Sequence, residues 1–559
     1  MSQSSDDAPT GPITGAHARH SAPAGSAPAP AAPTPHIAVQ PTRRGTIAIG
    51  LTAAALLIVA LVLPWNLYFG IGIPDSSITL FAALLAVTVL SLIAVALATS
   101  GRPASGLRLW LNVPYLLLVL GFVGFDAFET IRFGGTVTVP GGVGPGAWLG
   151  VAGALLGAQP AISAAADGPA FGRWVTAARI IGYASILGAT ASFGLNLYWR
   201  VRYALHAPGD STSFGKQNVA VIATAVIYGL VALIAVVVAS RWLLRSSKGS
   251  RLESVALGVS TLIAGVIVWA LPVGRDIDAF HGIAQNTSTA GVGFEGYLAW
   301  VAAAAIFAPR AFARQRHPST NEENAWRTAA RNGLLLIAVW CVGSVVMRID
   351  DLAVAVTLNY PFSRYDTLVL AAFDLVTAVL AIWLRINLVS ATLSARLTSS
   401  LCGLVATLSV ARVVVGVALA PRFAEAPDAV AQNPVYGNDL AQQITSTFDV
   451  ALSVLALCIL AAAIITGQLS GRRLRRQKRR AARAQVAPAG APPSVGEPTT
   501  RIPVSGVPTP SAAATTRIQT GPPAPQPAPS PRIFRGDDSA TRQLPLQKPQ
   551  IYRPPNDTT

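Results

Sequence analysis

The sequence predicts an all-α, polytopic membrane protein with about twelve transmembrane helices, and three observations support this fold class. Of the 559 residues, 52% are hydrophobic and only 12% are charged, whereas roughly a quarter of the residues in soluble domains are charged. Apolar runs of about 20 residues, long enough to cross the hydrocarbon core of a membrane, recur along the middle of the chain. The runs are unbroken instead of alternating, which indicates helices and not a β-barrel.

Twelve apolar runs can be placed in order between two Pro-rich ends. We expect transmembrane helices at residues 45–65, 77–98, 107–125, 146–165, 176–198, 218–240, 253–272, 293–308, 332–348, 366–388, 397–421 and 445–467. Residues 1–42 are rich in Ala, Pro, Ser and Thr, so we expect a disordered tail that cannot bury enough apolar surface to fold. No signal peptide is expected before the first run, because that run continues as a full span.

Basic residues in the connections set the expected orientation. Arg43 and Arg44 precede the first run, and every second connection after it is basic. The alternate connections are poorer in Lys and Arg, with one weak exception at Arg200, Arg202 and Lys216. Such loops stay in the cytoplasm, so we expect a bacterial plasma (inner) membrane protein with both termini cytoplasmic. The basic residues of these connections are Arg102, Arg108, Arg173, Arg179, Arg241, Arg245, Lys248, Arg251, Arg310, Arg314, Arg316, Arg385 and Arg396.

The net charge of +17 would suggest a nucleic-acid partner in a soluble protein. Here the charge follows the loops and the C-terminal tail, so the expected partner is the lipid bilayer, with no nucleic acid. The three cysteines, Cys341, Cys402 and Cys458, all lie inside apolar runs. They are read as small core residues and not as a disulfide framework.

Repeated words predict an internal duplication. Asn66–Phe69 (NLYF) returns as Asn196–Trp199 (NLYW), and Asp126–Phe128 (DAF) returns as Asp278–Phe280. Gly-Val-Gly with a following aromatic-Leu pair also occurs twice, at 142–149 and 291–298. We expect four-helix repeats in the same orientation; chance similarity among apolar segments is the alternative. The expected divisions are a tail at 1–42, repeat one at 43–170, repeat two at 171–315, spans nine to twelve at 316–467 as a third, divergent repeat, and a disordered tail at 468–559.

One charged residue in the apolar runs is the main candidate for a site. Arg412 lies near the middle of the run at 397–421, where a charge normally faces a partner or a water-filled cavity. Asp374 and Asp449, each following a Phe, are the acids available to it. The group is either a structural ion pair that locks the helices or a site for a substrate anion or a coupling proton.

Asp126 and Asp278 are candidates for an outward-facing entrance, because both precede Gly-rich loops at expected outer helix ends. They can equally be ordinary solvated ends. The histidines have no ligand spacing, so no metal and no cofactor is expected.

Missing motifs argue against an enzyme. The sequence contains no P-loop, no H-E-x-x-H, no C-x-x-C and no G-x-S-x-G. Membrane glycosyltransferases have a similar number of spans, but they usually carry an acidic motif in a large first outer loop, where this chain has only Asp75.

The favoured function is a transporter or lipid-handling protein of the cell envelope with a central polar pathway. The alternatives are a non-catalytic scaffold regulated through its tail and, third, a glycosyltransferase-like enzyme.

The C-terminal tail carries two further signals. The basic run Arg472–Arg483 directly follows the last span, so it either binds anionic lipid or only fixes topology. An aliphatic residue stands three positions after each of Thr499, Thr515 and Thr541. This arrangement resembles the ligands of forkhead-associated domains, which bind phosphothreonine in an Arg-lined pocket. We therefore predict phosphorylation at these threonines and a phosphothreonine-binding partner; chance occurrence in a Thr-rich tail is the alternative.

The NLY[FW], DAF and GVG words, the high Ala content and the Pro-rich ends together resemble uncharacterised multi-spanning envelope proteins of high-GC Gram-positive bacteria. The resemblance covers the membrane block and the style of the tail. It implies a helical membrane fold and no particular activity.

Overall fold

The protein was examined as a computed structural model, which describes residues 43–486 except positions 67 and 246 and the connections 101–104, 134–140, 160–168, 207–214, 271–290, 312–319, 360–363, 389–393 and 425–445. The described residues form twelve α-helices. Their bounds are α1 Arg43–Ala60, α2 Ile78–Thr99, α3 Ser105–Phe133, α4 Pro145–Ala158, α5 Pro169–His206, α6 Lys216–Leu244, α7 Lys248–Ala270, α8 Gly293–Ala311, α9 Thr320–Leu358, α10 Arg364–Asn387, α11 Ala395–Ala424 and α13 Thr447–Val486.

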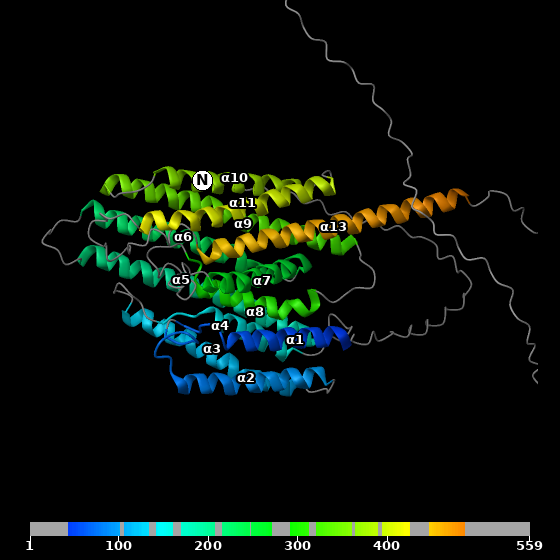
Figure 1. Ribbon diagram of the computed structural model, residues 1–559, viewed down its shortest axis with the longest axis horizontal. Helices are drawn as coiled ribbons and strands as arrows, with labels where there is room; N and C mark the ends of the chain where they lie inside the picture. Colours follow the sequence, from blue (N-terminus) through cyan, green and yellow to red (C-terminus); the bar gives the residue numbers. More distant parts are fainter. Residues whose placement is uncertain are drawn as a thin grey trace, which may run out of the picture. The chain divides into compact units, whose positions relative to one another are not determined.

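The predicted all-α, polytopic fold class is confirmed. Each of the twelve expected spans overlaps one helix, and in Figure 1 the helices lie side by side along a common direction. Within the described part of the chain, nine helices are long and apolar enough to cross a membrane, and Gly45–Ala60 and Pro145–Ala158 are shorter apolar helices. Side chains such as Leu117, Leu187 and Val379 are exposed on the bundle, as expected for a surface that faces lipid.

Three groups of four helices share one packing order. In α1–α4, α5–α8 and α9–α13, consecutive helices pack together and the first helix of each group packs on the last. The groups also meet one another, because α4 packs on α8, α6 on α9, and α7 on both α9 and α13. The last helix of each group therefore lies toward the middle of the bundle.

Helix α4 begins deep inside the protein. All its residues from Pro145 to Ala158 are buried, and the preceding Gly144 supplies no side-chain cap. The backbone N–H groups of Gly144 and Gly146 donate instead to the carbonyls of Trp65 and Pro64, at 2.6 and 2.9 Å. These bonds satisfy N–H groups that a helix start otherwise leaves without partners.

Such a close approach requires glycine at position 146. A Cβ there would lie 2.6 Å from the Leu63 carbonyl oxygen and 2.8 Å from that of Pro64. Both neighbours are backbone atoms, which cannot move aside as a flexible side chain can.

The two copies of NLY[FW] form different structures. Asn66 and Phe69 close a tight turn after α1, in which Trp65 N and Asn66 N both donate to Phe69 O. Asn196–Trp199 instead lies within α5. Pro64 explains the difference, because the residue before a proline disfavours helical geometry and proline itself cannot donate a helical hydrogen bond. The second copy has no proline, so its helix continues.

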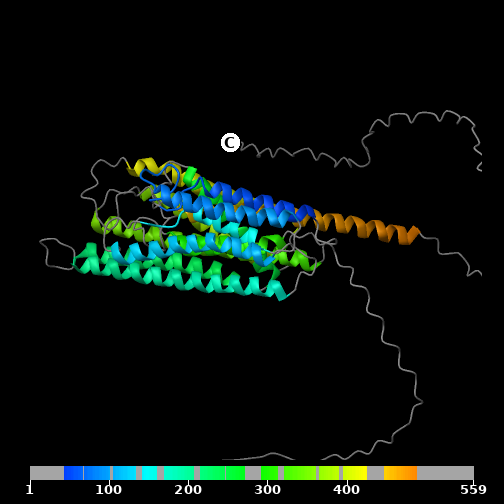
Figure 2. The same cartoon turned by 90° about the horizontal axis from the view of Figure 1, so that it is seen from below.

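Several helices are longer than the sequence predicts, and α9 and α13 exceed their expected spans the most. Helix α9 covers Thr320–Leu358, against an expected span of 332–348. Helix α13 continues to Val486, so the expected tail at 468–559 begins with a helical segment, which projects beyond the other helices in Figures 1 and 2. The expected spans stop where charged residues interrupt the apolar runs. The helices continue beyond these points, because Arg, Lys, Gln and Ala are good helix formers.

Candidate functional site

Arg412 lies in α11 and is the centre of a buried group of charges. It is 6% exposed. Its Nε lies 2.6 Å from Asp374 Oδ1 and its Nη1 lies 2.6 Å from Asp449 Oδ1. Its Nη2 donates to Ser344 Oγ at 3.0 Å. The structure therefore brings together the three residues that the sequence singled out for this site.

Asp374, on α10, receives contacts from two other helices. It is completely buried. Its Oδ2 accepts hydrogen bonds from Ser344 Oγ at 2.7 Å and from Arg348 Nε at 3.2 Å, both on α9. The contact from Arg412 Nε to Asp374 Oδ1 is close, but it lacks the geometry of a hydrogen bond. We treat it as an ion pair held by charge.

Asp449 does two things at the start of α13. Its Oδ2 accepts from the N–H and the hydroxyl of Ser446, at 2.9 and 3.2 Å, while Ser446 Oγ accepts from Asp449 N at 3.2 Å. This reciprocal pattern is a capping box that starts the helix. Its Oδ1 accepts from Trp340 Nε1 and pairs with Arg412. The same carboxylate therefore caps α13 and joins it to α9 and α11.

We call Arg348, Asp374, Arg412 and Asp449 the charge cluster. Two arginines face two aspartates, so the formal charges balance. Balance matters here, because removing a single partner from a buried ion pair costs about 3–5 kcal/mol. The cluster can hold the four helices in one arrangement. It can also change its pairing if the helices move, since Arg412 already contacts acids on two different helices.

The sequence analysis missed Arg348 and Ser344. Arg348 is at the last position of the expected span at 332–348, where a charge is unremarkable. Because α9 continues to Leu358, Arg348 is in fact inside a helix and only 6% exposed. A longer window over α9 would have shown it as a second intramembrane arginine near an acid.

Two further acids of α9 were also missed. Asp350 accepts from Thr224 Oγ1 at 2.7 Å, and Asp351 accepts from Tyr228 Oη. Both donors are on α6. These bonds join the second and third groups of four helices.

A row of aromatic rings extends from the charge cluster into the middle of the bundle. Trp340 contacts Phe448 with ring centroids 4.7 Å apart, and Phe448 contacts Trp300 at 5.6 Å. Tyr297 then lies 5.9 Å from Trp300 and 4.9 Å from Trp148 of α4. Trp148, Trp300 and Trp340 are almost completely buried. The row joins the last helices of all three groups through packed rings.

Asp126 has a different place from the one expected. It is 2% exposed, and its Oδ1 accepts the backbone N–H of Gly142 at 2.7 Å. The side chain therefore holds the buried loop before α4 and does not line an open entrance or a solvated helix end. Asp278, the other entrance candidate, lies outside the described residues, as do Thr499, Thr515 and Thr541.

Arg108 corrects another expectation. It was counted with the basic connections, but it lies in α3 and is 5% exposed. Its Nε and Nη2 donate to the Gly157 carbonyl at 3.3 and 3.0 Å. A cation suits that position, because the carbonyls at the end of α4 carry partial negative charge.

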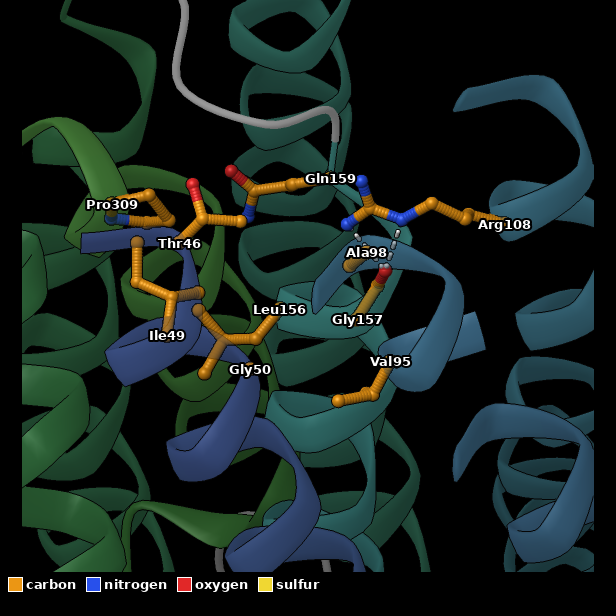
Figure 3. A pocket seen from close by; sticks show the side chains of 10 residues that line it. All are labelled: Thr46, Ile49, Gly50, Val95, Ala98, Arg108, Leu156, Gly157, Gln159 and Pro309. Carbon is orange, nitrogen blue, oxygen red and sulfur yellow. Dashed lines mark hydrogen bonds between the residues drawn. The ribbon is translucent and has the colours of Figure 1, made fainter. Parts of the chain in front are cut away.

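Arg108 and Gln159 line a small pocket at the end of the bundle where α1 begins (Figure 3). Gln159 Nε2 donates to the Ala305 carbonyl of α8 at 2.6 Å. About 20 Å³ is open to the centres of water molecules, enough for about one water and too little for a substrate. In the described part of the chain, no three His, Cys, Asp or Glu side chains are grouped to hold a metal ion.

Fold and charge cluster together define the class of this protein: it is an integral, multi-pass helical membrane protein. Residues 50–468 match the family model of a domain of unknown function, DUF7937, and the chain belongs to that family. No curated protein and no solved structure matches the chain.

Proposed function

We propose that this protein is a transporter or lipid-handling protein of the cell envelope, and that the charge cluster is the charged part of its pathway. The observation that carries the proposal is Arg412, buried among α9, α10, α11 and α13 and paired with acids from two of them. Intramembrane charges are costly, and they mark substrate, ion or proton pathways in membrane proteins.

The pairing of Arg412 suggests how the site works. A ligand with an anionic group can take the place of Asp449 on Arg412, because both offer oxygen acceptors to the same guanidinium. Asp449 also caps α13, so its release from Arg412 would loosen the start of that helix. In the arrangement described here the cluster is buried, which corresponds to a closed state.

The four-helix repeat remains a proposal that fits this function. The common packing order of α1–α4, α5–α8 and α9–α13 is what three repeats in one orientation require. In transporters built from repeats, substrate sites lie at the boundary between the repeats. The charge cluster lies within the third group and reaches that boundary through Trp340 and Phe448.

Cys341 offers a direct test. It follows Trp340, is 3% exposed and lies beside Asp374. A protein that keeps only this cysteine, through Cys402→Ala and Cys458→Ala, is exposed in membranes to a small, water-soluble thiol reagent. If the cluster opens to water during transport, Cys341 reacts slowly but completely, as measured by mass spectrometry.

The matched control keeps only Cys402, which is 2% exposed and lies on α11 ten residues before Arg412, or about 15 Å along the helix axis. It is expected to stay unmodified over the same time. If Cys341 is equally unreactive, the cluster never opens, and it is a structural lock.

A second candidate, a membrane scaffold, is favoured by α13. Its apolar part ends near Gly467, yet the helix continues to Val486 through the basic run Arg472–Arg483. We propose that this segment binds anionic lipid and presents the tail for phosphorylation at Thr499, Thr515 or Thr541 and docking of a forkhead-associated partner. An unreactive Cys341 would favour this function. A glycosyltransferase-like enzyme is the third candidate function.

The bacterial plasma membrane, with both termini cytoplasmic, is the proposed location.

A further inference from the structure

Glu253 is a buried acid outside the charge cluster. It lies on α7, five residues after Lys248, or about 7 Å along the helix axis. Its side chain is 1% exposed. Its Oε1 accepts no hydrogen bond, and the carboxyl forms no ion pair with any described residue. Asp374 and Asp449, equally buried, each contact an arginine.

The carboxyl of Glu253 lies where three helices meet. A Cβ on Gly333 of α9 would be 2.7 Å from Glu253 Oε1 and 2.8 Å from Ile459 Cδ1 of α13. The absence of a side chain at position 333 therefore creates the space that the carboxyl occupies. α7 packs on both of these helices.

Among the described residues, no cation pairs with this carboxyl, and the Arg251 guanidinium of the same helix lies over the rings of Phe171 and Phe307. On α13, Cys458 is a titratable neighbour of Glu253. The Cys458 thiol lies 3.9 Å from the hydroxyl of Ser260. α4 has no titratable residue. In the described part of the chain, no charged side chain of α6, α8, α9 or α13 pairs with Glu253. Arg385 of α10 donates its Nε to the backbone carbonyl of Arg331.

An unpaired, ionised carboxylate costs several kcal/mol in such surroundings, so Glu253 carries a proton in this arrangement. A metal ion is a poor alternative. Hard cations need six or more oxygen ligands, whereas Gly333 and Ile459 offer none from a side chain, and Ser254 Oγ donates to its own helix at Ser250 O.

We propose that Glu253 is a proton-binding site, which releases and takes up its proton when α7, α9 and α13 move apart. This inference rests on the proposed transport function, and it makes the proton the coupling ion. The charge cluster then binds the transported molecule, and Glu253 binds the proton, at two separate places in the bundle.

The first test is chemical and needs no substrate. A hydrophobic carbodiimide, which reacts with protonated carboxyls, is added to the full-length protein in membranes from acid to alkaline pH. Peptide mass spectrometry should find Glu253 modified, several-fold more at acid than at alkaline pH. Asp374, also buried but paired with Arg412, serves as the internal control and should stay unmodified.

Two results would overturn the proton site. If Glu253 is unmodified at every pH, the three-helix contact does not open. If it is modified to the same extent at every pH, the carboxyl never loses its proton and is a static part of the core. Neither result bears on Cys341, so this test can fail while the proposed function stands.

The second test addresses coupling. The full-length protein is reconstituted in liposomes containing a pH-sensitive dye, and a potassium diffusion potential is imposed. Wild type should acidify the interior, and Glu253→Gln, which keeps the shape but cannot ionise, should reduce the signal to that of empty liposomes. An unchanged signal in Glu253→Gln, or none in wild type, would overturn the coupling role.

Discussion

Helices α4 and α13 both begin inside the bundle, but different interactions hold their first turns. At α4 the partners are mostly backbone: Gly144 N and Gly146 N donate to the carbonyls of Trp65 and Pro64, and Asp126 holds Gly142 N. At α13 they are mostly side chains: Asp449 N donates to Ser446 Oγ, and the Asp449 carboxylate is held by Trp340 and Arg412. Both arrangements satisfy N–H groups that lipid could not satisfy.

The difference has a physical consequence. Backbone contacts need glycine and close approach, so the start of α4 is sensitive to added volume and has little ability to rearrange. Contacts between charged side chains tolerate added volume, but they require that positive and negative charges balance. One charged partner can also be exchanged for another. We therefore place the moving part of the protein at α13 and the fixed part at α4.

The largest effect is expected from Arg412→Met. This change leaves Asp374 with Arg348 and removes the ion pair of Asp449, so it should destabilise the protein by about 3–5 kcal/mol. Thermal unfolding in detergent, followed by tryptophan fluorescence, measures the loss. The control is Arg385→Met, whose arginine donates to the backbone carbonyl of Arg331 and forms no ion pair with an acid among the described residues. Equal losses in both variants would show that the cluster has no special role.

An intermediate effect is expected from Gly146→Ala. The added methyl would meet two carbonyl oxygens within 2.8 Å, and overpacking of this kind costs about 1–3 kcal/mol. Gly121→Ala is the control, since nothing lies within 4 Å of a Cβ there, and it should leave the unfolding temperature almost unchanged. If Gly146→Ala is equally harmless, the start of α4 is not rigid.

The smallest effect is expected from Asp126→Asn. The amide oxygen can still accept from Gly142 N, so the loss at this hydrogen bond is limited to its charge assistance, about 1 kcal/mol. Asp449→Asn should cost more, because it also removes the ion pair with Arg412. The comparison of the two unfolding temperatures decides whether charge matters more at α13. A loss for Asp126→Asn as large as that for Asp449→Asn would contradict the contrast between the two helix starts.

Part of the candidate site could be predicted from the sequence. Arg412 stands out because it interrupts an apolar run, and Asp374 and Asp449 are among the few acids near it. Arg348 could not be found in this way, because the apolar window ended at that residue while the helix continued. Glu253 was missed for a similar reason: it lies at the edge of a run, where an acid normally faces water.

The sequence by itself determined the class of the protein and the order of its helices, because span length and hydrophobicity are local properties that can be read from consecutive residues. Only the tertiary structure decided the rest. It made Asn66–Phe69 a turn and Asn196–Trp199 a helix, it buried Asp126 and Arg108, and it left Glu253 without an ion-pair partner among the described residues. These outcomes depend on contacts between residues far apart in the chain, such as Gly144 with Trp65 and Arg108 with Gly157. No periodicity or composition records such contacts, because they form only when separate helices pack against one another.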